Sequence, residues 1–136
     1  MTRPLSVGVA GLGTVGAGVL TMLRTNADLI AGRAGRPIAV TAVSARERTR
    51  DRGVSLSGLR WYEDAVALAA DPGVDVVVEA IGGAEGAARA TVEAALAAGK
   101  PVVTANKALL AVHGADLAQR AERAGVVLAF EAAVAG

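Results

Sequence analysis

Short runs of β-branched and other apolar residues alternate with longer alanine-rich segments along the whole chain. Six of the short runs have the length of strands and occupy residues 5–10, 38–44, 59–62, 74–80, 101–105 and 126–131. Between them, apolar residues recur at helical spacing, most clearly over residues 14–30 and 108–124. Most of the runs are almost continuously apolar, which is typical of parallel strands covered by helices on both faces. The pattern therefore predicts an α/β fold with a doubly wound, mostly parallel, six-stranded sheet.

The composition is that of one folded domain with little net charge. The chain has 136 residues, the length of a single domain, and 53% of them are apolar, which excludes a disordered chain. Fourteen basic and thirteen acidic side chains leave a net charge of +1, so binding to nucleic acid or to a membrane surface is not predicted. Cysteine is absent and His113 is the single histidine, which excludes thiolate catalysis, zinc–sulfur sites and a two-histidine relay.

The uncharged stretch over residues 4–23 raises the question of a signal peptide or a membrane span. Five glycines interrupt this stretch: Gly8, Gly11, Gly13, Gly16 and Gly18. These glycines break the continuous apolar helix that either role requires. We therefore predict no secretion signal and a cytoplasmic protein.

The glycines that follow the first predicted strand form a GxGxxG pattern, which opens the helix predicted from residue 14. In this context Gly11 permits a tight turn, Gly13 lets a pyrophosphate approach the backbone, and Gly16 lets the helix pack close to the sheet. The backbone N–H groups near Thr14 and Val15 would then meet the phosphate charge. A glycine-rich turn without a ligand is the alternative, which the position directly after the first strand disfavours. The sequence therefore predicts a Rossmann domain that binds a dinucleotide.

The end of the second predicted strand bears on the choice between NAD and NADP. NAD-binding folds usually end this strand in Asp or Glu, which binds the ribose 2′-hydroxyl. Here Ser44 ends the strand and Arg46 follows within two residues. Because a hydroxyl and a guanidinium suit a 2′-phosphate, we assign both residues to cofactor binding. A solvated charged loop is the favoured interpretation for Arg48, Arg50 and Arg52.

Lys107 is one of only two lysines, and it follows the fifth predicted strand at the edge where doubly wound folds bind their ligands. We predict that its cation faces the nicotinamide or the substrate, and that Thr104 at the end of the strand also belongs to the cofactor site. A solvated lysine at a helix start is the alternative, although a positive charge there interacts unfavourably with the helix dipole. Lys100 precedes the strand on the opposite edge and is predicted to be a surface residue.

The fourth predicted strand runs into Ile81, Gly82 and Gly83, a turn that would let a nicotinamide ribose lie against the backbone. We therefore place Ile81 and Gly82 in the cofactor site. Glu79 lies inside this apolar strand and needs a partner if it is buried, so a role in the site and a role as an ordinary strand residue both stay open. We interpret His113 as a surface or packing residue of its helix and not as a catalytic group.

Four segments of the chain resemble the amino-terminal, nucleotide-binding domain of homoserine dehydrogenase in their order and spacing. They are residues 11–16 (GLGTVG), 76–83 (VVVEAIGG), 103–109 (VTANKAL) and 130–136 (FEAAVAG). Many dehydrogenases share the glycine pattern, whereas the TANK and FEAAV segments together are specific to this family. The resemblance extends over all 136 residues.

The resemblance implies NAD(P)-dependent interconversion of L-aspartate 4-semialdehyde and L-homoserine, on the route to threonine, methionine and isoleucine. It implies that Lys107 lies beside the nicotinamide and the substrate and takes part in catalysis. It also implies a sodium ion held by Glu131 and by the backbone carbonyls of Val134 and Gly136. A further carbonyl ligand would lie beyond Gly136, so this sodium site is expected to be incomplete.

Members of this family continue into a region that binds the substrate and forms dimers, with a second lysine and acidic substrate ligands. Residues 1–136 are therefore expected to be a truncated form, a cofactor domain that binds NADP or NAD but does not turn over aspartate semialdehyde. Homo-oligomers are expected through apolar residues near 126–134. Two alternatives stay open: a binding module that senses NAD(P)H and conveys it to a partner, and the cofactor domain of another small-substrate dehydrogenase such as aspartate dehydrogenase.

Overall fold

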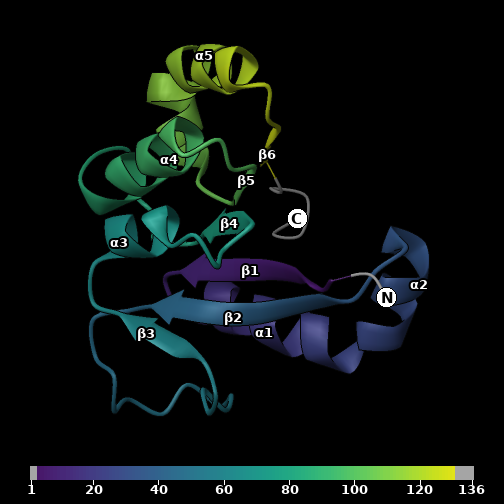
Figure 1. The fold of residues 1–136 in the computed structure, drawn as a ribbon. Coiled ribbons are helices and arrows are strands. Elements are labelled where there is room, and N and C mark those ends of the chain that lie inside the picture. The colour runs from purple at the N-terminus through teal and green to yellow at the C-terminus, as the bar shows by residue number, and fades with distance from the viewer. Residues whose placement is uncertain (1–2, 131–136) are drawn as a thin grey trace.

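The computed structural model describes residues 3–130, which form a six-stranded, all-parallel sheet in the order β3-β2-β1-β4-β5-β6 (Figure 1). The strands are β1 Leu5–Ala10, β2 Ile38–Ser44, β3 Arg60–Tyr62, β4 Val76–Glu79, β5 Val102–Thr104 and β6 Leu128–Phe130. The helices are α1 Thr14–Thr25, α2 Ala27–Ala34, α3 Ala65–Ala70, α4 Ala87–Ala97 and α5 Lys107–Ala124. The strand order reverses between β1 and β4, so the predicted doubly wound α/β fold is confirmed.

The central strands send alternate residues to the two faces of the sheet, and helices cover both faces. Val7 and Val9 of β1 pack with Leu20 of α1 in one core cluster. Gly8, between these valines, faces Leu68 of α3 on the other side of the sheet. The second cluster joins α3, α4 and α5 to the sheet and includes Leu68, Val77, Val92, Val102 and Leu117. Burial on both faces explains why the strand sequences are almost continuously apolar.

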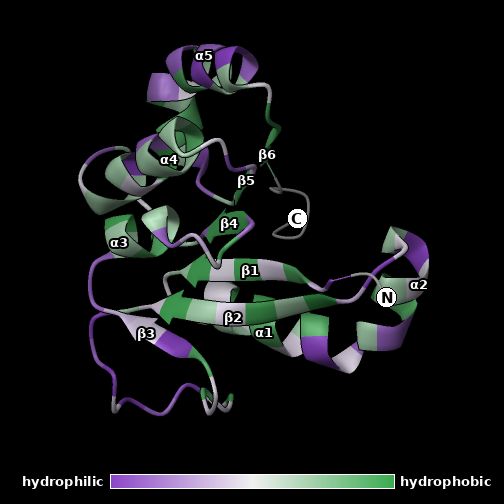
Figure 2. Cartoon of the chain, viewed as in Figure 1, coloured by the Kyte–Doolittle hydropathy of each residue, from purple (hydrophilic) through white to green (hydrophobic). Residues whose placement is uncertain are grey.

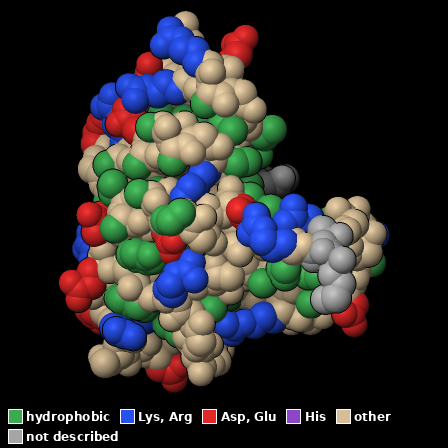
Figure 3. All heavy atoms as spheres, in the orientation of Figure 1, with side chains coloured by type: hydrophobic (Ala, Val, Ile, Leu, Met, Phe, Trp, Pro, Cys, Tyr) green, Lys and Arg blue, Asp and Glu red, His purple; other side chains and the backbone are tan. Residues whose placement is uncertain are grey.

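Hydropathy follows this layered arrangement. The strands are mostly hydrophobic in Figure 2, whereas hydrophilic residues lie in the loops and on the outer sides of the helices. Basic and acidic side chains are interspersed on the face seen in Figure 3, in line with the net charge of +1. Among residues 3–130, no helix combines the length and the apolar character that a bilayer span requires.

The prediction of one helix over residues 14–30 is wrong, because the structure divides this segment into α1 and α2 at Asn26. The backbone N–H of Asn26 keeps the helical bond to the carbonyl oxygen of Met22, but the side-chain amide of Asn26 donates to the same oxygen. The φ of −108° and ψ of 24° of Asn26 leave the helical range and end α1. The helix predicted over residues 108–124 is confirmed as α5. It ends as expected at Gly125, whose φ of 70° lies in the left-handed region.

Lys100 is not the surface residue that the sequence predicts. Its ammonium group donates to the carbonyl oxygens of Ala69 and Asp71 at the end of α3, at 2.7 and 2.5 Å. Burial lowers the pKa of Lys100. The side chain therefore caps the last turn of α3, where carbonyl groups without a helical partner favour a cation.

Asp71 is held by two side chains of β3. The Tyr62 hydroxyl donates to its carboxylate at 2.6 Å, and Arg60 Nε donates to the same oxygen at 2.9 Å. The hydrogen bond from Tyr62 is the largest cause that lowers the pKa of Asp71. A carboxyl whose pKa is lowered by folding stabilises the folded state above its unfolded pKa, and this contribution is lost as the pH falls through the folded pKa.

We therefore expect Tyr62→Phe to lower the free energy of unfolding by about 1 kcal/mol near neutral pH. The loss should shrink as the pH falls through the lowered pKa of Asp71, because the carboxylate then becomes protonated in both proteins. Urea denaturation of both proteins across this pH range measures the difference. A loss that is the same at every pH would show that the hydroxyl does not act through the charge of Asp71.

Candidate functional site

The carboxyl ends of β1, β4 and β5 meet at one edge of the sheet, and the turns that follow them line a pocket of about 230 Å³. The lining residues are Val15, Glu79, Ala80, Ile81, Gly82, Ala105 and Asn106. A larger and more open groove of about 340 Å³ is lined by residues of α4 and α5 alone. Because doubly wound folds bind ligands where the strand order reverses, we assign the candidate site to the pocket at the strand ends.

Gly11 and Gly16 are both required by the fold around this pocket. Gly11 has a φ of 99°, and a Cβ added to it would lie 2.7 Å from the carbonyl oxygen of Ala80. Its N–H donates to the carbonyl oxygen of Ser44, which ties the turn to the end of β2. A Cβ added to Gly16 would overlap the carbonyl oxygen of Gly11. The tight turn and the close packing of α1 that the sequence predicts for these two glycines are therefore confirmed.

Gly13 differs from the other two glycines of the pattern. Its φ of −73° and ψ of −160° are open to any residue, and a Cβ added to it would meet no atom of residues 3–130 within 4 Å. Gly13 is the N-cap of α1, and a glycine has no side chain that could cap this helix end. The first turn of α1, with Thr14 and the 52% exposed Val15, thus begins next to open space. Neither the backbone nor the packing explains a glycine here, and the exposed helix end leaves room for an anionic group to approach its N–H groups.

The two residues predicted to bind the 2′-phosphate, at the end of β2, differ in their exposure. Ser44 is 3% exposed, whereas Arg46 is exposed. Within residues 3–130, no hydrogen bond or ion pair engages the Arg46 guanidinium, which leaves its N–H donors available to a ligand.

Two other arginines of this loop, Arg48 and Arg52, have contacts within the protein. Arg52 donates to the carbonyl oxygens of Glu47 and Arg50 and thereby orders the loop. The guanidinium groups of Arg48 and Arg52 lie 5.8 and 5.6 Å from the centre of the Trp61 ring, a cation–π geometry.

Glu79 ends β4 with a fully buried carboxylate. One of its oxygens accepts hydrogen bonds from the backbone N–H groups of Ile81 and Gly82, at 2.8 and 3.1 Å. Its other oxygen accepts from the Thr104 hydroxyl at 2.6 Å. These partners answer the question that the sequence leaves open, because three donors satisfy the buried carboxylate.

The turn after β5 leads directly into Lys107 at the start of α5. Asn106 is the N-cap of α5, since its side-chain oxygen accepts from the N–H of Leu109 at 3.0 Å. Its side-chain amide donates to the carbonyl oxygen of Gly83 at 2.6 Å. Lys107 is the first residue of α5 and is exposed, whereas Thr104 is buried with its hydroxyl turned to Glu79.

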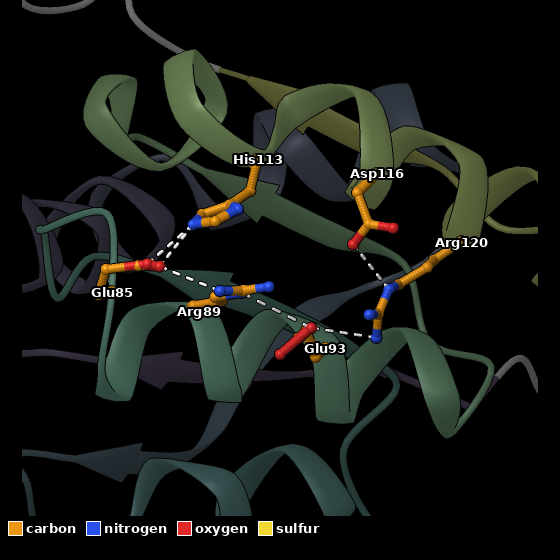
Figure 4. A network of polar contacts seen from close by, with 6 residues as sticks. All are labelled: Glu85, Arg89, Glu93, His113, Asp116 and Arg120. Atoms are coloured by element: carbon orange, nitrogen blue, oxygen red, sulfur yellow. Dashed lines mark hydrogen bonds and ion pairs between the residues drawn. The ribbon is translucent and has the colours of Figure 1, made fainter.

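His113 finds its acidic partner in another segment. Its Nε2 lies 2.5 and 2.9 Å from the two carboxylate oxygens of Glu85, in the loop after β4. This contact is the largest cause that lowers the pKa of Glu85. Figure 4 shows that it begins a network of polar contacts along α4 and α5, which continues through Arg89, Glu93, Arg120 and Asp116. The interpretation of His113 as a packing residue stands, because this pair lies outside the pocket at the strand ends.

The structure leaves one predicted group of ligands undescribed and adds one residue that was not predicted from the sequence. The predicted sodium ligands Glu131, Val134 and Gly136 lie outside the described residues. Asn106 lines the pocket and joins the turns after β4 and β5, but the sequence analysis did not select it. Its position directly before a helix was the available signal, because asparagine is a favoured N-cap.

Comparison with known proteins also identifies a nucleotide-binding domain of a dehydrogenase. Residues 11–131 match the family described as "Homoserine dehydrogenase, NAD binding domain". The chain is 46% identical to a homoserine dehydrogenase of Pseudomonas aeruginosa over 134 residues, which cover 98% of this chain and 30% of that protein. It is 49% identical to the enzyme of Corynebacterium glutamicum, with coverage of 96% and 29%.

Solved structures agree with these sequence matches. A homoserine dehydrogenase from Thiobacillus denitrificans superposes with a TM-score of 0.88 at 45% identity, over 96% of this chain and 30% of that chain. This chain therefore spans about 30% of the length of the relatives that it matches.

A doubly wound parallel sheet with a GxGxxG turn between β1 and α1 defines a Rossmann-type dinucleotide-binding domain. The similarity narrows this class further. The chain belongs to the family of homoserine dehydrogenase NAD-binding domains.

Proposed function

We propose that this chain binds NADP(H) across the carboxyl ends of β1 and β4, and that it forms the cofactor half of a homoserine dehydrogenase. The observation that carries the proposal is the open space at Gly13, in front of an uncapped helix end. At the N-terminus of a helix, a glycine that neither its φ nor its packing requires is best explained by a ligand that approaches the backbone.

The first turn of α1 binds the pyrophosphate in this proposal. The backbone N–H groups of Thr14 and Val15 donate to phosphate oxygens, and the positive end of the helix dipole faces the negative charge. Gly11 and Gly16 keep the turn tight enough for these groups to converge.

The end of β2 binds the adenosine half. The exposed guanidinium of Arg46 pairs with the 2′-phosphate, and the hydroxyl of Ser44 at the strand end also belongs to this part of the cofactor site. We therefore infer that NADP(H) binds at least as tightly as NAD(H).

The turns after β4 and β5 bind the nicotinamide half. Ile81 and Gly82 lie against the ribose, Thr104 supports the turn, and the cation of Lys107 faces the substrate. The bound nicotinamide supplies the hydride chemistry that interconverts L-aspartate 4-semialdehyde and L-homoserine. Lys107 stabilises negative charge on the substrate oxygen in this arrangement. A cytoplasmic location, a homo-oligomeric state and the sodium site stay predictions of the sequence.

Nucleotide binding is tested by calorimetric titration of the chain with NADPH and with NADH. We expect both to bind, with NADPH binding at least as tightly as NADH. Thermal unfolding gives an independent readout, because a ligand that binds only the folded state raises the Tm. If neither nucleotide produces heat or raises the Tm, the proposed cofactor site is wrong.

The reaction is tested in a chimera in which these residues replace the matching segment of the Pseudomonas aeruginosa relative. We expect the chimera to oxidise L-homoserine with NADP⁺, and we expect Lys107→Ala in the chimera to lower kcat. A chimera that folds and binds NADPH but does not oxidise L-homoserine would contradict the assigned reaction while leaving cofactor binding intact.

A further inference from the structure

The buried carboxylate of Glu79 is not explained by pairing between the strands. β4 and β5 are already joined by their parallel backbone ladder, in which Glu79 lies opposite Thr104. Within the described residues, Glu79 forms no ion pair with a lysine or an arginine. A buried carboxylate costs free energy unless hydrogen bonds satisfy it. Its presence in an otherwise apolar strand therefore points to what its three donors hold in place.

All three donors come from the ends of strands and the turns beyond them. The N–H groups of Ile81 and Gly82 belong to the turn after β4, and the Thr104 hydroxyl belongs to the last residue of β5. Gly82 has a φ of 91°, so this turn takes a conformation that few residues adopt without support. Glu79 supplies that support from beneath the turn.

The same set of contacts continues to the start of α5 and closes on itself. The Thr104 hydroxyl oxygen accepts from the N–H of Asn106 at 3.0 Å. The Asn106 side chain then donates to the carbonyl oxygen of Gly83, in the turn that Glu79 holds. The closed ring of Glu79, Thr104 and Asn106 therefore fixes the turn after β4 relative to the residue that precedes Lys107.

We infer that Glu79 is a positioning residue, which acts through Thr104 and Asn106 to shape the nicotinamide half of the cofactor site. The inference rests on the proposed function, since that function places the nicotinamide at these two turns. Glu79 and Asn106 both line the pocket, so a change in the ring changes the pocket wall directly.

The geometry predicts that the two halves of the cofactor depend differently on this ring. Arg46 and Gly13 serve the adenosine and pyrophosphate end, and no hydrogen bond of the ring reaches either of them. The affinity for 2′,5′-ADP, which lacks the nicotinamide, should therefore be independent of Glu79. The affinity for NADPH should depend on Glu79.

The test compares NADPH with 2′,5′-ADP by calorimetric titration of the full chain. We expect Glu79→Ala to raise the Kd for NADPH about tenfold, because it removes the acceptor for three donors. The Kd for 2′,5′-ADP should stay within about twofold of wild type. We expect Glu79→Gln to restore most of the NADPH affinity, since its amide oxygen still accepts from the turn and its NH₂ group can donate to Thr104.

Thr104→Val keeps the inference testable if Glu79→Ala does not fold, because it removes one hydroxyl while nearly preserving the shape. It should weaken NADPH binding without weakening 2′,5′-ADP binding. Thr91→Val is the matched control, since Thr91 is equally buried and its hydroxyl donates to Ala87 within α4. The control should leave both affinities unchanged.

The outcomes separate this inference from the proposed function. If the wild-type chain binds neither NADPH nor 2′,5′-ADP, the proposed function fails and the inference fails with it. If the wild type binds both, and the Glu79 and Thr104 variants weaken both equally or weaken neither, the cofactor site stands but Glu79 does not position its nicotinamide half.

Discussion

Replacing Gly13 with valine is expected to raise the Kd for NADPH at least about 100-fold, while the free energy of unfolding stays within about 1 kcal/mol of wild type. The φ and ψ of Gly13 are accessible to valine, and a Cβ placed there meets no atom of the described residues within 4 Å. The added side chain would instead fill the space in front of the first turn of α1. The pyrophosphate would lose its approach to the helix N–H groups.

Two other glycines of the same segment provide the controls for this experiment. A Cβ at Gly18 also meets nothing within 4 Å, but Gly18 lies inside α1, away from the helix end. Gly18→Val should therefore leave NADPH binding unchanged. Gly16→Ala, unlike Gly13→Val, should destabilise the fold, because its Cβ would overlap the carbonyl oxygen of Gly11.

Calorimetric titration and thermal unfolding of the three variants separate binding from stability. A folded Gly13→Val protein with wild-type affinity for NADPH would show that the nucleotide lies elsewhere. Loss of binding in Gly18→Val would show that side chains anywhere on the exposed side of α1 interfere, and the special role of Gly13 would be lost.

The strands could be predicted from the sequence because continuous apolar runs in this fold mark burial on two faces. All six predicted runs contain a strand, but four of the strands are shorter than their runs. The run over residues 74–80 begins at Val74, which is buried without being in a strand and whose N–H donates to Asp71 in a turn. Apolar character reports burial, whereas strand bounds depend on which neighbouring strand is within hydrogen-bonding reach.

Contacts between distant segments could not be predicted from local spacing. Thr104 reaches Glu79 across 25 residues, and Glu85 reaches His113 across 28. Both pairs meet because β4 and β5 lie side by side in the sheet, which also brings together the segments that follow them. The sequence could place Thr104 and Lys107 at that edge, but it could not show that the hydroxyl of Thr104 is turned inward to a carboxylate.

The break between α1 and α2 illustrates a different limit. Apolar residues keep their helical period through Asn26, so periodicity alone predicts one helix. The side-chain amide of Asn26 competes with the helix by donating to the carbonyl oxygen of Met22. Such local competition depends on a rotamer, which a one-dimensional pattern does not contain.

Replacing Arg46 with aspartate is expected to shift the cofactor preference from NADPH towards NADH. A charge-assisted hydrogen bond to a phosphate is worth enough that its loss should raise the Kd for NADPH about 10- to 100-fold. The new carboxylate would repel the 2′-phosphate but accept from a ribose 2′-hydroxyl, so NADH should bind no more weakly than to wild type.

Arg50→Asp is the matched control for this change, because it makes the same change in net charge four residues along the loop. Arg50 is exposed, and within residues 3–130 its guanidinium makes no hydrogen bond or ion pair, whereas its carbonyl oxygen accepts from Arg52. If the effect of Arg46 is a direct contact, Arg50→Asp should change the Kd for NADPH only slightly, and that small change should vanish as added salt screens it. If both variants weaken NADPH binding equally, Arg46 contributes only its charge to the electrostatic field around the loop and makes no direct contact with the 2′-phosphate. Tight binding of NADH alone by the wild-type chain would overturn the 2′-phosphate assignment itself, since Ser44 and Arg46 would then occupy the position of the usual acidic residue without replacing its function.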